Sequence, residues 1–354
     1  MATDRVLVDA SALERAVAAI LHVRGFGEQD AARSARVLVS ADLRGVESHG
    51  VSNMLRRYLA WIDSGHLNPT PQVSVIHQKA CVASYDADGG LGLAVLPVLM
   101  QEAVERARQY GIAMVGVRNA RHSGMLAFHT MLASEQDMVG VCATSGGPRV
   151  IPTFGREPRL GTNPLSVALP SNDDHPFVFD AATSVVAYNK IANARRDGDL
   201  LGGGWCADES GTPMMDQRPS DLDVDERMLP LGSSPELGSH KGYALSAVVD
   251  VLASILPNGT FIGNLGHGYN GHFLTAIDPA GFGPLEEFKS QVSEFARYLR
   301  TTPRADRDVA VLVPNDLEWT TMCERRRSGI PVHREVITWF DKVCDEYGLQ
   351  YLSR

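Results

Sequence analysis

The residues with the clearest chemical capacity lie near the N-terminus, in the segment DLRGVESHGVSNMLRRY at positions 42–58. Ser48 and His49 are adjacent there, and three arginines accompany them. An imidazole accepts and releases a proton near neutral pH, and an arginine binds a carboxylate through two parallel hydrogen bonds. The segment therefore predicts proton transfer on an acidic substrate. A structural interpretation competes with it, in which Ser48 caps a helix and Gly50 supplies dihedral angles that other residues avoid.

A second polar segment, RNARHSG at 118–124, places His122 just beyond an apolar, partly β-branched run at 111–117. That run predicts a buried strand. The runs GGP at 146–148 and RLGTNP at 159–164 predict loops that expose backbone N–H groups.

Several familiar motifs are absent or misplaced. The dinucleotide-binding pattern GxGxxG occurs at 266–271, but residues 272–277 predict a strand, and the pattern functions only where a strand turns directly into a helix. A serine hydrolase is disfavoured because Ser48 and His49, as sequence neighbours, point in different directions on a helix or a strand. No metal site is expected, since no three ligands stand at a familiar spacing.

The composition bounds the class of protein. The chain has 354 residues and a net charge of −9, from 42 acidic and 33 basic residues, and it has no dense basic cluster that would bind nucleic acid. Its 5 cysteines are scattered without a CxxC pair, which favours a reducing compartment. No apolar run is long enough for a membrane span, and the N-terminus lacks a signal-peptide pattern. We expect a soluble, cytoplasmic protein.

Hydrophobic periodicity predicts an α/β chain without internal repeats. The expected helices lie at 11–25, 28–43, 54–62, 93–110, 125–135, 184–195, 241–256, 285–299, 316–327 and 332–347, and the expected strands at 72–77, 81–85, 111–117, 138–143, 165–169, 177–180, 272–277 and 309–313. Within the C-terminal half, the helix at 241–256 shows the clearest pattern of a buried helix. The mixed order favours helices packed around a mixed sheet, with a separate helical lobe built from both termini.

Five motifs then make the sequence specific: RGVESHG at 44–50, RHSGM at 121–125, RLGTNP at 159–164, DAATS at 180–184 and SHKGY at 239–243. In order and spacing they resemble the malate/L-lactate dehydrogenase family, which also includes ureidoglycolate, sulfolactate and diketogulonate oxidoreductases. The resemblance covers almost the whole chain. It implies an NAD(P)-dependent oxidoreductase with a large mixed β-sheet flanked by helices, a non-Rossmann cofactor fold and a homodimer.

The resemblance also implies roles for the histidine segments. His49 is the first candidate for the group that exchanges a proton with the substrate hydroxyl, with Ser48 fixing the geometry of the site. In some relatives the histidine matching His122 is the proton acceptor, so both assignments stay open. Thr162 would form a further polar side of the pocket.

The substrate carboxylate would be bound by Arg44 and Arg56. Many relatives carry an arginine four residues after the motif histidine, where this chain has Asn53, and Arg56 is the expected replacement. Some members place an acid near Lys190 to support the histidine, which a lysine cannot do. The sequence of residues 46–56 resembles that of the malate-type branch of the family.

The expected cofactor is NAD, with NADP as the alternative. The family pattern assigns cofactor binding to the motif histidine and to two strand or helix ends, namely to His122, Asp180, Ala181, Ala182, His240, Lys241, Pro314 and Asn315. Relatives read Pro-Gly at 314–315, and the asparagine here tolerates the same left-handed turn.

The sequence therefore predicts hydride transfer between a nicotinamide and C2 of a small 2-hydroxy or 2-oxo acid, malate first. The alternatives are an NADPH-dependent reductase of another 2-oxo or cyclic imino acid, and a catalytically silent relative that acts as a binding protein. Three parts are expected: a helical segment at 1–75 for the substrate and dimer lobe, a mixed-sheet NAD(P)-binding domain at 76–280, and a C-terminal helical segment at 281–354 that packs back on the first.

Overall fold

The computed structural model describes residues 4–222, 227–265, 268–350 and 352. In chain order its elements are β1 (Arg5–Val8), α1 (Ala10–Val23), α2 (Glu28–Leu43), η1 (Glu47–His49), α3 (Val51–Asp63), β2 (Ser74–Lys79), β3 (Val82–Asp86), α4 (Gly92–Tyr110), β4 (Ile112–Ala120), α5 (Leu126–Ser134), β5 (Val139–Thr144), β6 (Leu165–Leu169), β7 (Phe177–Ala181), α6 (Tyr188–Asp197), α7 (Ser239–Asp250), η2 (Val251–Ile255), α8 (Ile262–Leu265), β8 (Asn270–Ile277), η3 (Pro279–Gly281), α9 (Leu285–Arg300), α10 (Asp316–Ser328), β9 (Ile330–His333) and α11 (Arg334–Tyr347).

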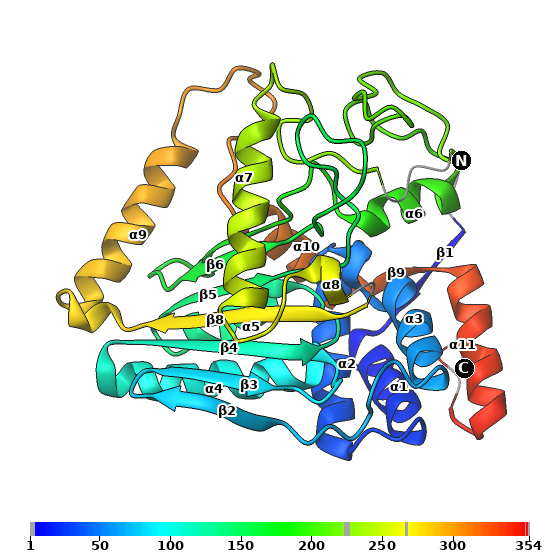
Figure 1. The fold of residues 1–354 in the computed structure, drawn as a ribbon, viewed down its shortest axis with the longest axis horizontal. Helices are drawn as coiled ribbons and strands as arrows, with labels where there is room; N and C mark the ends of the chain where they lie inside the picture. The colour runs from blue at the N-terminus through cyan, green and yellow to red at the C-terminus, as the bar shows by residue number, and fades with distance from the viewer. Residues whose placement is uncertain (1–3, 223–226, 266–267, 351, 353–354) are drawn as a thin grey trace.

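The centre of the molecule is a 7-stranded mixed sheet in the order β2-β3-β4-β8-β5-β6-β7 (Figure 1). Only β3 and β4 run parallel, and every other neighbouring pair is antiparallel. The apolar runs at β4 and β8 explain their central position, because a strand covered on both faces can bury every side chain. The prediction of a large mixed sheet flanked by helices is confirmed.

Helices cover both faces of this sheet. α4 and α5 pack against one face, and α7 with the π-helical turn η2 packs against the other (Figure 1). The α4 side encloses a core of small and branched side chains that includes Val104, Val115 and Leu274. The strand ends near α5 are thereby held rigidly.

The two ends of the chain meet in a second layer of structure. β1 pairs antiparallel with β9, and residues of α1, α2, α3 and α11 share one hydrophobic core. α9 lies apart from this lobe, where Ser293 accepts a hydrogen bond from the backbone of Asn172 at 2.9 Å. The three-part division of the chain at 75 and 280 stays a prediction.

Several expected elements need correction. The expected strand at 309–313 is wrong: these residues have no regular structure and are exposed except for the partly and fully buried positions 311 and 313. The helix expected from 184 begins at Tyr188. The pairing strands β1 and β9 were not expected, because each is short and its partner lies at the other end of the chain.

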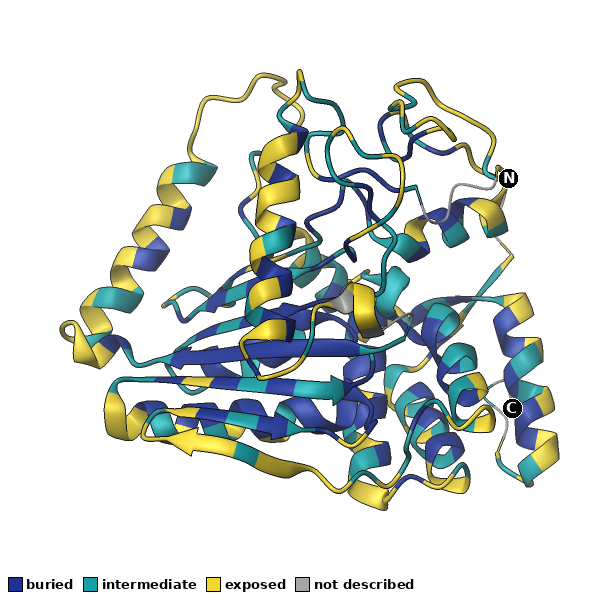
Figure 2. Cartoon of the chain, viewed as in Figure 1, coloured by how far each residue is buried: buried dark blue, intermediate teal, exposed yellow. Residues whose placement is uncertain are grey.

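The helix expected at 241–256 to be buried instead exposes a row of apolar side chains. In α7 and η2 the side chains of Leu245, Val248, Val251 and Ile255 are 38%, 53%, 49% and 45% exposed. Their spacing places them on one helical face (Figure 2). The apolar pattern was read as burial within one chain, whereas only the opposite side of the helix contacts the sheet.

Candidate active site

A cavity of about 240 Å³ opens where the α2–α3 junction meets the ends of β4, β5 and β7. Of the residues that the sequence singled out, it is lined by Arg44, Ser48, His49, His122, Thr162, Asp180, Ala181 and Ala182. Residues from distant parts of the sequence thus converge on one pocket. Five others do not line it: Arg56, His240, Lys241, Pro314 and Asn315.

The α2–α3 junction owes its shape to a buried carboxylate. Asp42 accepts a hydrogen bond from the Val51 backbone N–H at 2.8 Å and so caps α3 from the preceding helix. A Cβ on Gly50 would overlap that carboxylate, while Gly50 itself has an ordinary extended φ of −85°. The glycine is therefore required for close approach, and the expected unusual dihedral angles are wrong.

The Ser48 hydroxyl lies 2.9 Å from Nδ1 of His49 instead of capping α3. Burial, followed by the charge of Arg57, lowers the pKa of His49 to about 4. A neutral ring whose Nδ1–H donates to Ser48 leaves the Nε2 lone pair free to accept a proton. His49 is thus equipped as a base.

At His122 the Nδ1 atom is a hydrogen-bond acceptor, the opposite of the donor role described for Nδ1 of His49. Its Nδ1 lies 2.7 Å from the Tyr58 hydroxyl and accepts a hydrogen bond from the Gly124 N–H at 3.1 Å. An accepting Nδ1 carries no proton, so the neutral ring is protonated at Nε2. Burial raises the pKa of Tyr58, which therefore keeps its proton, and burial together with His49 lowers the pKa of His122 well below its usual value.

The two rings stack, with centroids 5.5 Å apart and planes inclined by 17°. Within the described residues neither ring hydrogen bonds to a carboxylate. Lys190, at the position where some relatives have an acid, is exposed and lies over the Trp205 ring at 5.5 Å. In place of a carboxylate, Ser48 contacts His49 and Tyr58 contacts His122.

Two further histidines, missed by the sequence reasoning, clamp the loop that carries His122. Nε2 of His129 donates to the carbonyl of Ser123 at 2.8 Å, and Nε2 of His272 donates to the carbonyl of Arg121 at 3.1 Å. Burial lowers the pKa of these histidines to about 4 and about 3, respectively. Both are therefore neutral donors that fix the peptide groups on either side of His122.

One end of the cavity combines an arginine with acids. Asp180, at the end of β7, accepts from the Ala127 N–H at 2.7 Å and so caps α5, and Glu318 of α10 also lines this end. Asp180 is exposed toward the cavity, and the atoms packed around its carboxyl, followed by the charge of Glu318, raise its pKa to about 7. Burial lowers the pKa of Arg44, while Glu318 and Asp180 act in the opposite direction.

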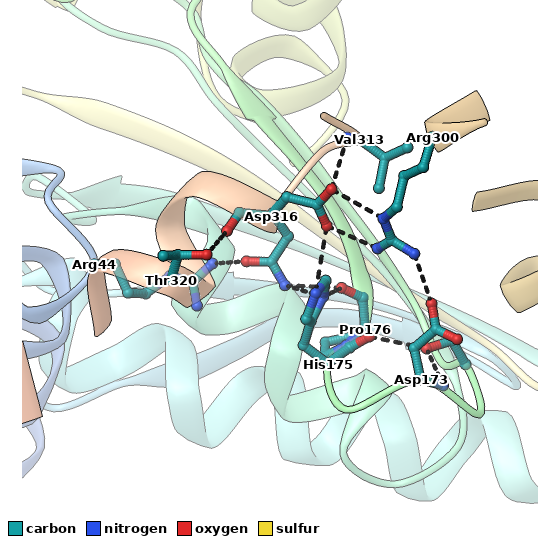
Figure 3. Close-up of polar contacts among 10 residues, drawn as sticks. Arg44, Asp173, His175, Pro176, Arg300, Val313, Asp316 and Thr320 are labelled. Atoms are coloured by element: carbon teal, nitrogen blue, oxygen red, sulfur yellow. Dashed lines mark hydrogen bonds and ion pairs between the residues drawn. The ribbon is translucent and has the colours of Figure 1, made fainter. Parts of the chain in front are cut away.

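Arg44 is anchored from behind by Asn315, whose side-chain oxygen accepts its hydrogen bond (Figure 3). Asn315 stands in the left-handed conformation with φ of 86°, as expected for this turn, and donates to the carbonyl of Pro176 at 2.8 Å. The next residue, Asp316, forms an ion pair with Arg300 at 2.7 Å, which also contacts Asp173 at 3.1 Å. This cluster joins α9 and α10 to the β6–β7 connection.

The other end of the cavity holds two arginines around one aromatic ring. The guanidinium carbon of Arg149 lies 3.7 Å from the centroid of the Tyr188 ring, and that of Arg57 lies 5.6 Å from it. Arg57 also donates to Asn189 at 3.3 Å. Within the described part of the chain, no acidic side chain forms an ion pair with either guanidinium. Sequence reasoning missed Arg57, Arg149 and Tyr188.

The prediction for Arg56 needs correction. Its guanidinium forms an ion pair with Glu335 at 2.9 Å and lies over the Trp339 ring at 5.0 Å, outside the cavity. Arg57 faces the cavity instead, because consecutive helical residues point about 100° apart. Arg57 stands one helical turn after Asn53, which is occupied by hydrogen bonds to Asn193 and Arg196. That i, i+4 spacing was the available signal.

The remaining expected cofactor residues lie elsewhere. His240 and Lys241 are exposed at the start of α7, and Pro314 lines a small separate hollow with Arg300. No group of three potential metal ligands occurs among the described residues. Gly266 and His267 of the GxGxxG pattern lie outside the described residues, and Gly271 belongs to β8, which confirms that a strand follows the pattern.

Comparison with known proteins agrees with this arrangement. The sequence profile described as Malate/L-lactate dehydrogenase matches residues 8–340. The chain belongs to this family. A malate dehydrogenase of Pyrococcus abyssi is 36% identical over 343 residues, which cover 95% of this chain and 94% of that relative. A malate/(S)-sulfolactate dehydrogenase of Methanothermus fervidus is 30% identical over 339 residues, 94% of this chain and 95% of the relative.

A solved structure shows the same fold. The malate dehydrogenase of Entamoeba histolytica superposes with a TM-score of 0.93 at 30% identity, covering 98% of this chain and 99% of that one. This member of the malate/L-lactate dehydrogenase family is therefore an oxidoreductase of the 2-hydroxy acid dehydrogenase type. Membership implies a nicotinamide cofactor and a small-molecule hydroxy acid substrate. No helix in the described ranges combines the length and apolar character needed to cross a bilayer.

Proposed function

We propose that this protein reversibly oxidises a small 2-hydroxy acid of the malate type to the 2-oxo acid, with NAD as the preferred acceptor. The observation that carries the proposal is the stacked pair His49 and His122, two neutral rings that line one cavity and whose Nδ1 atoms are both engaged by neighbouring groups, which leaves Nε2 of each ring for the substrate. The name of the Pyrococcus abyssi relative, a malate dehydrogenase, supports malate as the first substrate to test.

The residues at the acidic end fit a nicotinamide cofactor. Nε of Arg44 is buried without a hydrogen-bond partner among the described residues, and the Asp180 carboxylate can accept from ribose hydroxyls. Ala181 and Ala182 continue the same wall. When bound, the cofactor supplies the hydride acceptor. We assign its binding to these residues and to His122, with Asn315 acting only through its hydrogen bond to Arg44. His240, Lys241 and Pro314 lie outside this cavity and are left without a role in it.

We assign the proton chemistry to His49. In the oxidation direction its free Nε2 takes the proton of the substrate hydroxyl, and in reduction it returns that proton. The Nε2–H of His122 donates a hydrogen bond to the same substrate oxygen, and Tyr58 with the Gly124 N–H keeps His122 in that tautomer. Ser48 orients His49, and Thr162 lines the opposite wall.

We further propose a homodimer. The row Leu245, Val248, Val251 and Ile255 is an exposed apolar helix face of the kind that oligomers bury. The measurement is the mass in solution by light scattering. A dimeric mass that Val248→Glu converts to the monomer supports the proposal, and a monomeric wild type contradicts it.

The function is tested by absorbance at 340 nm. Purified protein is mixed with oxaloacetate, pyruvate, sulfopyruvate or a cyclic imine, with NADH and NADPH in parallel. Oxidation of NADH by a 2-oxo acid is expected. A preference for NADPH with the imine would favour the alternative reductase, and failure both to react and to change NADH fluorescence would favour a silent binding protein.

A further inference from the structure

Two arginines lie at the end of the cavity that contains Tyr188. Together they carry two positive charges, whereas a single substrate carboxylate would neutralise only one. Arg57 and Arg149 both line the cavity and surround the Tyr188 ring, and within the described residues no acid pairs with either. A partly buried cation is costly unless an anion accompanies it. An anionic ligand in the cavity would supply the counter-charge that the described residues do not provide.

Each guanidinium is held in place by the fold. The backbone N–H of Arg149 donates to Leu160 at 2.8 Å and its carbonyl accepts from Met228 at 3.0 Å, so the loop that carries it is fixed on both sides. Arg57 is oriented by Asn189, whose amide donates to the carbonyl of Ser48 at 2.6 Å. Stacking on Tyr188 leaves the guanidinium edge of Arg149, with its N–H groups, available for bidentate hydrogen bonds.

The two sites differ in their distance from the proton chemistry. Arg57 directly precedes Tyr58, which contacts His122, and its partner Asn189 also donates to the carbonyl of Ser48 beside His49. Arg149 stands on the loop after β5 and lies over the Tyr188 ring. A C1 carboxylate next to the reacting carbon belongs with the nearer arginine. The more distant arginine is left for a second acidic group.

We infer that Arg149, stacked on Tyr188, binds a second anionic group at C3 of the substrate, so that the enzyme selects dianionic 2-hydroxy and 2-oxo acids over monoanionic ones. This inference rests on the proposed function and adds a specificity-determining residue to it. A C3 carboxylate and a C3 sulfonate share the required chemistry.

The test compares oxaloacetate, sulfopyruvate and pyruvate as substrates of wild type, Arg149→Leu and Arg149→Lys. Arg149→Leu lowers kcat/KM for the two dianions about 10- to 100-fold, the loss of one charge-assisted hydrogen-bonded pair, and changes that for pyruvate less than about 3-fold. Arg149→Lys keeps the charge without the bidentate geometry and gives an intermediate loss. The relative losses for oxaloacetate and sulfopyruvate show which C3 acid the site fits better.

A matched control is Arg159→Leu. Arg159 lies in the neighbouring loop, its side chain is 71% exposed, and it pairs with Glu157 at 2.7 Å outside the cavity. Its removal leaves the ratio of the substrates unchanged. Equal losses for dianions and pyruvate in Arg149→Leu, or no loss in either, would overturn the inference.

A binding measurement separates this inference from the proposed function. Calorimetric titration with succinate, whose carboxylates have the spacing of those in oxaloacetate, and with acetate needs no turnover. Tighter binding of succinate that weakens in Arg149→Leu supports the site even if no 2-oxo acid reacts, in which case only the proposed function fails. Equal affinities for succinate and acetate overturn the inference even if turnover is found.

Discussion

The two ends of the cavity hold arginines in opposite electrostatic settings. At one end Arg44 has Asp180 and Glu318 near it and Asn315 behind it. At the other end Arg57 and Arg149 share an aromatic ring and have no acidic partner among the described residues. The acids near Arg44 already provide counter-charge at that end of the cavity, whereas Arg57 and Arg149 leave room for the anionic groups of a substrate.

The same contrast appears between neighbours on α3. Arg56 is paired with Glu335, whereas Arg57 contacts Asn189 and Tyr188 and has no acidic partner among the described residues. Identical side chains one residue apart therefore serve the surface and the site. Burial and pairing, and not residue type, distinguish them.

The largest effect is expected between the two ends, where the proton chemistry takes place. His49→Ala should lower kcat about 100- to 10,000-fold, because it removes the general base, and should leave NADH binding largely unchanged. Steady-state kinetics and NADH fluorescence check the two parts. Wild-type turnover in this variant would remove His49 from the mechanism.

The neighbouring arginines provide a matched pair. Arg57→Leu should lower kcat/KM for oxaloacetate about 10- to 100-fold, mainly through KM, because a charge-assisted hydrogen bond to the carboxylate is lost. Arg56→Leu removes only an exposed ion pair, worth about 0–1 kcal/mol, and should change kcat/KM less than about 2-fold. Comparable losses of kcat/KM in both variants would show that Arg56 and Arg57 do not differ in their contribution to substrate binding.

The pH profile sharpens the comparison further. Because the pKa of His49 is lowered to about 4, the base stays unprotonated above about pH 5, and kcat/KM for oxidation should be flat down to that pH and fall only toward pH 4. The charge of Arg57 contributes to that shift, so Arg57→Leu should move the acid limb upward. Because the pKa of Asp180 in the same cavity is raised to about 7, the profile is also measured in Asp180→Asn. An acid limb near pH 6.5 that persists in Asp180→Asn would be inconsistent with a desolvated His49.

The smallest effect concerns stability at the acidic end. The pKa of Asp180 is raised from 3.8 to about 7, so the folded state binds its proton more tightly, and the stabilisation is present below pH 3.8 and is lost as the pH rises through 7. The melting temperature of Asp180→Asn should therefore rise relative to wild type between pH 5 and 8, by no more than a few degrees. Thermal unfolding at both pH values measures this difference. A constant difference would mean that Asp180 is ionised throughout.

The local sequence was sufficient to predict the central strands of the sheet and to identify the segments that carry the two histidines of the site. The apolar runs at 111–117 and 272–277 predicted the central strands β4 and β8, and the motifs around Ser48 and His122 led to residues that line one cavity. These features depend on periodicity or on short motifs, which a single sequence displays.

The rest of the site could not be predicted from the sequence because it depends on contacts between residues far apart in the chain. The choice of Arg57 over Arg56 depends on Tyr188 and Glu335, which lie more than one hundred residues away in sequence. His129 and His272 occur in an ordinary helix and strand, and only the folded chain brings them to the carbonyls beside His122. The apolar face of α7 was misread because local patterning cannot distinguish a face covered by the same chain from one left exposed.

The different roles of the two ends of the cavity are tested most directly by a crystal structure with NAD and succinate bound together. The succinate carboxylates are expected at Arg57 and Arg149, beside Tyr188, and the nicotinamide half of NAD toward Arg44 and Asp180, with the two histidines between them. Succinate bound at Arg44, or NAD stacked against Tyr188, would contradict the assignment of both ends.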